Sequence, residues 1–325
     1  MNLLVTGGAG YIGSVVSSRL VAAGHKVTIL DNLCHGYPDA VPAGAELVVG
    51  DISHPETLRK LFASVKPEAV LHFAALIEAG ESMRVPELYF RANTAATLVL
   101  LEEMITAGIK KLVFSSTAAL YGEPESTPIR ESDSLKPTNA YGESKLLVER
   151  ALEWMNRVHG FRYASLRYFN AAGATETLGE RHNPESHLIP LVLQAAAGKR
   201  QNISIFGTDY PTQDGTCVRD YIHVLDLAEA HLLALEALQQ HDKLIYNLGN
   251  GKGFSVREVI QSAVRVTGKR IPVLEAPRRG GDPAVLIASS EKIQQELHWK
   301  PQYAELEGII ESAWKFYLNK IETRH

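Results

Sequence analysis

The sequence predicts an α/β fold in which a doubly wound parallel sheet is followed by a smaller C-terminal α/β lobe. Up to about residue 170, short apolar runs that suit buried strands alternate with helical stretches. After residue 171 this alternation weakens, and polar segments containing glycine separate shorter elements. The length of 325 residues, 45% of them hydrophobic, is enough for one large domain or two.

Composition and charge exclude several classes of protein. The net charge of −4, with acids and bases interspersed, gives no basic footprint for nucleic acid. No apolar run approaches the length of a membrane span, and we expect no signal peptide before Leu3. Cys34 and Cys217 form neither a C-x-x-C pair nor a metal-ligand spacing. We therefore expect a cytoplasmic protein, with no metal site.

The first fifty residues predict a strand, a glycine turn, a helix and a second strand. Residues 3–5 are an apolar run too short for a helix, and 14–23 have helical apolar spacing before Gly24. Between them, Gly7, Gly10 and Gly13 resemble the fingerprint of the Rossmann fold, with one extra residue after the first glycine. Such a turn lets a pyrophosphate approach the helix N-terminus. The competing interpretation is a turn that only packs helix on strand.

The acid that ends the second strand, residues 27–30, indicates the cofactor. Asp31 lies where a carboxylate would bind the adenosine ribose hydroxyls, and it would repel a 2′-phosphate. The following residues, 32–35, contain no arginine to bind that phosphate. The sequence therefore favours NAD over NADP.

The same alternation continues to residue 117. We expect strands at 45–49, 69–72 and 111–114, with helices at 56–64 and 86–107. Ligands of doubly wound sheets bind beyond the carboxyl ends of the strands, where Asp31, Asp51, Phe73 and Thr117 stand. We interpret His72, at the end of an apolar strand, as a buried core histidine.

A helix from Tyr141 to about His159 follows a polar loop at 121–139. Residues four apart share a helix face, so Tyr141 and Lys145 can point the same way. A nearby cation favours phenolate and is expected to lower the tyrosine pKa, giving a base that works near neutral pH. Taken alone, the pair is more simply explained as two ordinary surface residues of a helix.

The remaining chain predicts a second unit. We assign residues 1–170 to an NAD-binding domain, with a strand and a helix returned to it from about 217–248, and residues 171–325 to a substrate lobe. Expected elements are strands at 163–167, 203–206 and 244–248, helices at 187–198, 224–239 and 255–267, and a basic turn at 278–282. Arg219 and Arg279, both expected in turns, suit a diphosphate, although each could be a simple surface arginine.

Taken together, these motifs resemble the UDP-glucose 4-epimerase family of extended short-chain dehydrogenases/reductases over essentially the full length. The superfamily motifs are residues 6–13, 31–32, 50–52, 72–75, 115–122, 141–145 and 166–170. The motifs more specific to the epimerases are residues 187–190, 214–224 and 278–282.

The resemblance implies an NAD-dependent UDP-glucose/UDP-galactose 4-epimerase of galactose metabolism. NAD stays bound, a transient 4-keto sugar forms, and the catalytic residues are Tyr141, Lys145 and Thr117. The implied cofactor-binding residues are Gly7, Gly10, Tyr11, Ile12, Gly13, Asp31, Asn32, Asp51, Ile52, Phe73, Ala74, Ala75, Asn93, Ser115, Tyr141, Lys145 and Phe169. The implied UDP-sugar-binding residues are Thr117, Tyr168, Asn170, His187, Leu188, Phe206, Arg219, Arg279, Asp282 and Leu286. The resemblance also implies a homodimer.

Three positions depart from patterns common in the family. Ile77 replaces a lysine that contacts the cofactor in many members, which removes one contact. His187 stands where the family has a substrate-pocket asparagine. Leu286 stands where some relatives carry a bulky tyrosine, and this leaves room for an N-acetylated sugar.

Other functions on this fold remain open. A UDP-N-acetylglucosamine, UDP-pentose or UDP-glucuronate 4-epimerase would differ only in pocket details. A 4,6-dehydratase needs an acid/base pair after Thr117, where this chain has Ala118 and Ala119. A non-catalytic NAD-binding regulatory protein would tend to lose the tyrosine or the lysine, and both are present.

Overall fold

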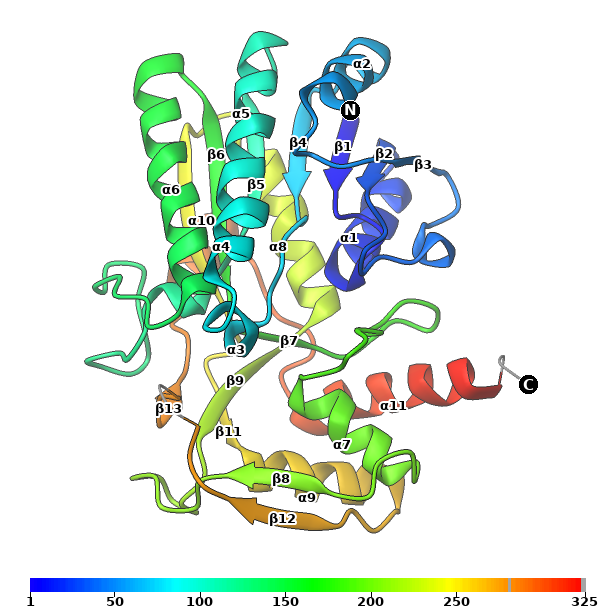
Figure 1. Cartoon of the computed structure of the whole chain (residues 1–325), viewed down its shortest axis with the longest axis vertical. Helices are drawn as coiled ribbons and strands as arrows, with labels where there is room; N and C mark the ends of the chain where they lie inside the picture. The colour runs from blue at the N-terminus through cyan, green and yellow to red at the C-terminus, as the bar shows by residue number, and fades with distance from the viewer. Residues whose placement is uncertain (280–281, 323–325) are drawn as a thin grey trace.

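The computed structural model, which describes residues 1–279 and 282–322, contains a seven-stranded parallel sheet (Figure 1). Its spatial order is β10-β6-β5-β4-β1-β2-β3. The strands are β1 (Asn2–Thr6), β2 (Lys26–Asp31), β3 (Ala45–Val49), β4 (Ala69–His72), β5 (Lys111–Thr117), β6 (Arg162–Tyr168) and β10 (Lys243–Leu248). The predicted α/β class is therefore confirmed.

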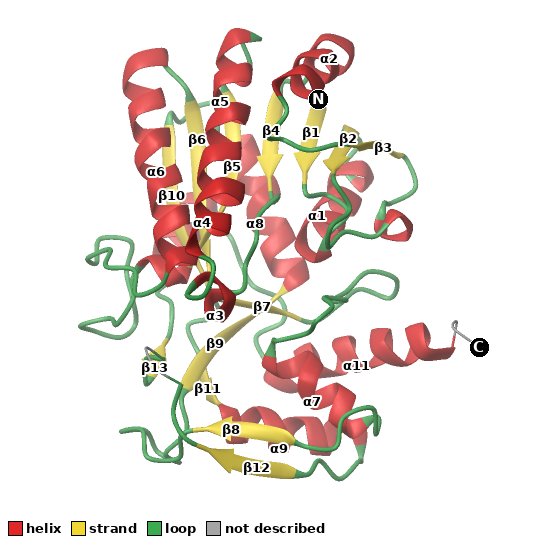
Figure 2. Cartoon of the chain, viewed as in Figure 1, coloured by secondary structure: helices red, strands yellow, loops and turns green. Residues whose placement is uncertain are grey.

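Helices cover both faces of this sheet (Figure 2). On one face lie α1 (Tyr11–Ala22), α8 (Val224–Ala237) and α10 (Glu291–Leu297); on the other lie α2 (Pro55–Val65), α5 (Ala96–Thr106) and α6 (Ala140–His159). Neighbouring residues of a strand point to opposite faces, so Leu3 and Val5 pack in the first apolar cluster and Leu4 in the second. Both faces being buried explains why the strands are continuously apolar.

The predicted helix over 86–107 is helical throughout but not uniform. It comprises α4 (Pro86–Tyr89), a π-helical segment (Phe90–Ala95) and α5. The π segment brings Asn93 to the loop after β4, where its side chain accepts from the Leu76 amide at 2.8 Å and donates to the Leu76 carbonyl at 2.9 Å. Such segments are frequent at functional sites. The same loop leads into the short helix α3 (Ala79–Ser82), which the sequence analysis did not predict.

A second group of elements lies beyond the carboxyl ends of the large sheet (Figure 1). Strand β9 (Val218–His223) pairs with β7 (Asn170–Ala172), β11 (Gly253–Ser255) and β13 (Val285–Leu286), while β8 (Ile203–Phe206) pairs with β12 (Val273–Ala276). Helices α7 (Leu188–Ala196), α9 (Val256–Thr267) and α11 (Leu306–Glu322) complete it. Within 217–248, α8 and β10 belong with the large sheet, whereas β9 belongs with the small one.

The two groups are joined without linkers. Strand β6 ends at Tyr168 and β7 begins at Asn170, so only Phe169 separates them. Strand β9 ends at His223, which is itself the N-cap of α8 and accepts a hydrogen bond from the Leu225 amide. Among the described residues, no helix has the length and apolar character needed to span a bilayer.

Candidate active site

The glycine turn after β1 is a surface of exposed backbone. Gly7 has φ +73°, and a Cβ on it would lie 2.5 Å from the Ala74 nitrogen. A Cβ on Gly13 would lie 2.3 Å from the Gly7 carbonyl oxygen. Gly10 is the N-cap of α1, so the first turn of this helix faces the cavity beside it. The turn therefore forms a cradle that only small residues allow.

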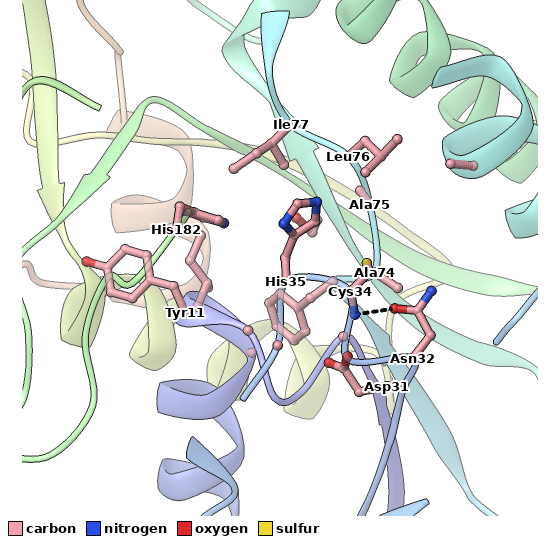
Figure 3. Close-up of a pocket in the computed structure, with 18 of the residues that line it drawn as sticks. Tyr11, Asp31, Asn32, Cys34, His35, Ala74, Ala75, Leu76, Ile77 and His182 are labelled. Atoms are coloured by element: carbon pink, nitrogen blue, oxygen red, sulfur yellow. Dashed lines mark hydrogen bonds between the residues drawn. The ribbon is translucent and has the colours of Figure 1, made fainter. Parts of the chain in front are cut away.

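This cradle is one wall of a cavity of about 490 Å³ at the carboxyl edge of the sheet (Figure 3). Asp31 is buried there, and its carboxylate accepts from the amides of Ala9 at 2.9 Å and Leu33 at 2.8 Å. The Asn32 side chain donates to Asp51 at 2.7 Å, which links the ends of β2 and β3. The cavity combines a helix N-terminus at one end with carboxylates at the other, an arrangement that suits a dinucleotide.

Of the predicted cofactor residues, all but Asn93 and Lys145 line this cavity. Asn93 is buried behind the wall and braces residue 76, and Lys145 is buried beneath Ser115. The sequence analysis missed other lining residues, among them Cys34, His35, Gly36 and Arg91. They come from a loop and the π segment, and no sequence pattern distinguishes them.

Helix α6 places Tyr141 and Lys145 against the end of β5. Asn139 caps the helix by accepting from the Gly142 amide at 2.8 Å. A Cβ on Gly142 would lie 2.6 Å from the Ala119 carbonyl oxygen, so glycine lets the helix start pack closely on the segment after Thr117. Lys145 is buried and donates to the Ser115 carbonyl at 2.9 Å.

The predicted direction of the Tyr141 pKa is wrong for this structure. Burial raises the pKa of Tyr141, a hydrogen bond with the Thr117 hydroxyl lowers it less, and the charge of Glu78 raises it further. Burial also lowers the pKa of Lys145 to about 7, so the lysine is a weak source of positive charge. Lys145 is directed at Ser115 and not at the phenol, which explains why the expected lowering is missing.

A second cavity, of about 1110 Å³, adjoins the first on the side of the smaller lobe. All ten predicted substrate residues line it, from Thr117 to Leu286. The two cavities share Thr117, Tyr168, Phe169 and Asn170, so the end of β5 and the β6–β7 junction form a common wall.

The two predicted arginines meet in this second cavity. Arg219 forms an ion pair with Asp282, and the Arg279 guanidinium lies 3.9 Å from the centre of the Phe206 ring. Arg219 lies on strand β9, so its predicted place in a turn is wrong. Within the predicted basic turn, residues 280 and 281 lie outside the described part of the chain. Phe206 and Arg279 together offer a flat ring and a cation, which suit a base and a phosphate.

Tyr168 and His187 have polar partners that sequence alone did not suggest. Tyr168 is buried with its hydroxyl bonded to His231. His187, the N-cap of α7, is bonded through Nδ1 to Glu185 at 2.9 Å. Although burial acts against it, the hydrogen bond with Glu185 and the charges of Glu180 and Glu185 raise the pKa of His187 to about 9. Ile77 and Leu286 both line the second cavity.

Known proteins with this sequence and fold agree with the geometry. The model of the "NAD dependent epimerase/dehydratase family" matches residues 3–249. The chain is 53% identical over 315 residues to a UDP-glucose 4-epimerase from Streptomyces lividans, covering 97% of this chain and 95% of the relative. It is 50% identical over 316 residues to the UDP-glucose 4-epimerase of Corynebacterium glutamicum, covering 97% and 95%.

Solved structures agree. A UDP-glucose 4-epimerase from Brucella ovis in complex with NAD superposes with a TM-score of 0.94 at 43% identity, covering 96% of this chain and 97% of that one. A UDP-Glc/GlcNAc 4-epimerase from Campylobacter jejuni superposes with a TM-score of 0.86 at 42% identity, covering 98% and 99%. These matches confirm the predicted resemblance, and the chain belongs to the NAD dependent epimerase/dehydratase family.

Proposed function

We propose that this chain is an NAD-dependent UDP-glucose 4-epimerase that interconverts UDP-glucose and UDP-galactose in galactose metabolism. One observation carries the proposal: the cavity suited to a dinucleotide and the cavity suited to a nucleotide sugar share a wall at Thr117, whose hydroxyl is bonded to Tyr141. A hydroxyl of a sugar bound there would lie beside both a proton acceptor and the cofactor. The identity to UDP-glucose 4-epimerases, 53% in one case, supports the same activity.

In this proposal NAD, when bound, accepts a hydride from the sugar and returns it. Tyr141 takes the proton of the sugar hydroxyl and gives it back, so it acts as base and then as acid. Thr117 holds the reacting oxygen through its hydroxyl. Lys145 carries a proton that burial makes easy to lose, since its pKa is about 7, and it supports the phenol from beneath Ser115.

The second cavity would hold the uridine diphosphate. Arg219 and Arg279 are the cations placed for the phosphates, and Phe206 offers a ring face. Holding the substrate by this end leaves the sugar ring free to present either face to the cofactor. The assignment of residues 1–170 to cofactor binding and 171–325 to substrate binding is part of the same proposal.

A wider sugar specificity is the second candidate function. Leu286 lines the second cavity on β13, where its modest side chain leaves space for an N-acetyl group. Structural similarity to an epimerase of both UDP-Glc and UDP-GlcNAc supports this candidate. UDP-pentose and UDP-glucuronate 4-epimerases remain weaker alternatives, because no observation favours them.

We also propose a cytoplasmic homodimer. Helices α5 and α6 expose large apolar side chains, with Leu98 40%, Trp154 62% and Val158 66% accessible. A second copy of the chain would cover them. The free thiols of Cys34 and Cys217 suit a reducing compartment.

The test is a coupled assay with UDP-galactose, UDP-GalNAc, UDP-arabinose and UDP-galacturonate side by side, on the parent and on Tyr141→Phe. We expect turnover of UDP-galactose, and a loss in the variant of at least about 100-fold, with NAD still bound. Absence of turnover of UDP-galactose would reject the proposed reaction. Full activity of Tyr141→Phe would reject the assigned base. Turnover of UDP-GalNAc decides the second candidate.

A further inference from the structure

Four potential metal-binding side chains gather where the two cavities meet. They are Glu180, His182, Glu185 and His187, and one donor atom from each lies within 4.8 Å of those of the others. All four come from the segment 180–187, which ends at the N-cap of α7. Glu180 and His187 line both cavities, and Figure 3 shows His182 on the same side of the first cavity as Tyr11.

The contacts inside the cluster leave polar atoms unsatisfied. His187 Nδ1 lies 2.9 Å from Glu185 Oε1 and 3.9 Å from Glu180 Oε2. His182 Nδ1 touches Glu180 Oε1, yet both atoms are buried and neither makes a hydrogen bond of acceptable geometry. Buried polar atoms normally have such a partner. A cation between these two atoms would satisfy both.

The burial of the carboxylates points the same way. Glu185 and Glu180 expose only 6% and 12% of their side chains, and His182 exposes 19%. Buried carboxylates are stable when they are paired with cations or coordinate a metal. Among the described residues the cluster has no arginine or lysine ion-pair partner, because the ion pairs of Glu180 and Glu185 are with His182 and His187.

We propose that these four side chains bind one divalent transition-metal ion, of which Zn²⁺ is the best match. Two imidazole nitrogens and two carboxylate oxygens suit Zn²⁺ better than Mg²⁺ or Ca²⁺, which prefer oxygen ligands. Ligands at about 2.0–2.2 Å from a tetrahedral ion lie about 3.4 Å apart, so side-chain rotations of about 1 Å would complete the coordination. Four protein ligands leave no open position, which indicates a structural ion and not a catalytic one.

The ion would fasten residues 180–187 to the start of α7. It would also fix His187 by Nδ1, the ring atom that faces both glutamates, and leave Nε2 free toward the second cavity. The spacing E-x-H-x-x-E-x-H is visible in the sequence, but the prediction of no metal site considered only the cysteines. This site does not depend on the proposed catalytic function.

The test is direct metal binding to the untagged full-length chain after chelator treatment. Equilibrium dialysis with Zn²⁺, followed by elemental analysis, should give one ion per chain. Removing an outer-shell partner typically costs 10–100-fold in affinity, so loss of a ligand in Glu180→Gln, His182→Asn or Glu185→Gln should cost at least about 100-fold. The matched controls are Glu176→Gln, an exposed carboxylate in the preceding loop, and His159→Asn, an exposed histidine; both should bind like the parent.

Two results would overturn the site. One is less than about a tenth of an ion per chain in the parent, and the other is equal affinity in Glu180→Gln and Glu176→Gln. Should a ligand variant fail to fold, X-ray absorption at the zinc edge of the parent decides: two imidazoles with oxygen ligands support the site, and a sulfur ligand or an all-oxygen shell rejects it.

Discussion

The two cavities differ in the material from which the chain builds them. The first is walled largely by backbone: a Cβ on Gly7 or Gly13 would come within 2.5 Å of main-chain atoms. The second is walled by charged and aromatic side chains from distant segments, such as Phe206 on β8, Arg219 on β9 and Arg279 before β13. Ligand recognition in the first therefore depends on close approach, and in the second on charge and ring contacts.

This difference predicts opposite sensitivities. A backbone surface tolerates no added atoms but has few side chains to lose. A side-chain surface loses binding when a single charge is removed, while the fold around it stays intact. The substitutions below test the contrast, from the largest expected effect to the smallest.

Gly13→Ala should be the most damaging. The new Cβ would lie 2.3 Å from the Gly7 carbonyl oxygen and 2.9 Å from Gly8 Cα, and neither is the end of a flexible side chain. We expect a loss of about 1–3 kcal/mol in the free energy of unfolding and at least a tenfold loss of NAD affinity. Chemical denaturation and NAD titration measure the two. Gly308→Ala, whose Cβ would meet nothing within 4 Å, is the control and should keep both values. Equal behaviour of the two variants would contradict the backbone cradle.

Arg279→Leu should act on the second cavity alone. Removing a charge-assisted contact to phosphate costs about 1.5–3 kcal/mol, so KM for the UDP-sugar should rise about 10–100-fold, with unchanged NAD affinity and melting temperature. The control is the neighbouring Arg278→Leu. That arginine is directed at Asp209, at 2.7 Å, and should be dispensable. A larger effect at 278 than at 279 would refute the assigned phosphate site.

Lys145→Met separates stability from catalysis. The folded-state pKa of Lys145, about 7, lies below its ordinary value of 10.5, so between these values the unfolded chain binds more protons and stability rises with pH. The variant should lose this rise, at most about 1.4 kcal/mol per pH unit, and should also lose epimerase activity. Unfolding of NAD-free protein at pH 7 and 9 measures it. Lys252→Met, at an exposed lysine, should keep the parent slope, and an unchanged slope in Lys145→Met would show that the lysine is charged.

Asp39→Asn should have the smallest effect. Asp39 accepts two hydrogen bonds from Arg181, at 2.8 and 2.9 Å, which joins the turn after β2 to the segment beside the second cavity. The hydrogen bond with Arg181 lowers the pKa of Asp39 to about 2, so its contribution is complete above the ordinary pKa of 3.8 and is lost as the pH falls toward 2. Because Asp39 is 59% exposed, we expect less than about 1 kcal/mol. A difference in melting temperature from the parent that persists at pH 2 would contradict this origin.

The first cavity could be predicted from sequence because its determinants are local. Gly7, Gly13 and Asp31 lie within one strand–helix–strand unit, and their spacing alone fixes the turn and the strand end. Asn93 was placed at the cofactor by resemblance, but its role in bracing residue 76 depends on a π-helical segment that helical periodicity does not reveal.

The second cavity could be predicted only through resemblance. The side chain of Arg219 enters it because β9 pairs with β13, a two-residue strand too short to carry a periodic pattern. The direction of the Tyr141 pKa failed for a related reason. Helical spacing placed Lys145 near Tyr141, but the depth of burial and the Ser115 carbonyl that receives the lysine are properties of the packed chain.

The linker-free joints between the two groups of elements have a consequence for the kinetics of exchange. One residue separates β6 from β7, and none separates β9 from α8, so the lobes cannot swing apart without breaking strands that pair on both sides. A molecule held between them must enter and leave past surface loops. The rate of that passage, and not a movement of whole domains, then limits how fast a bound nucleotide sugar can be replaced.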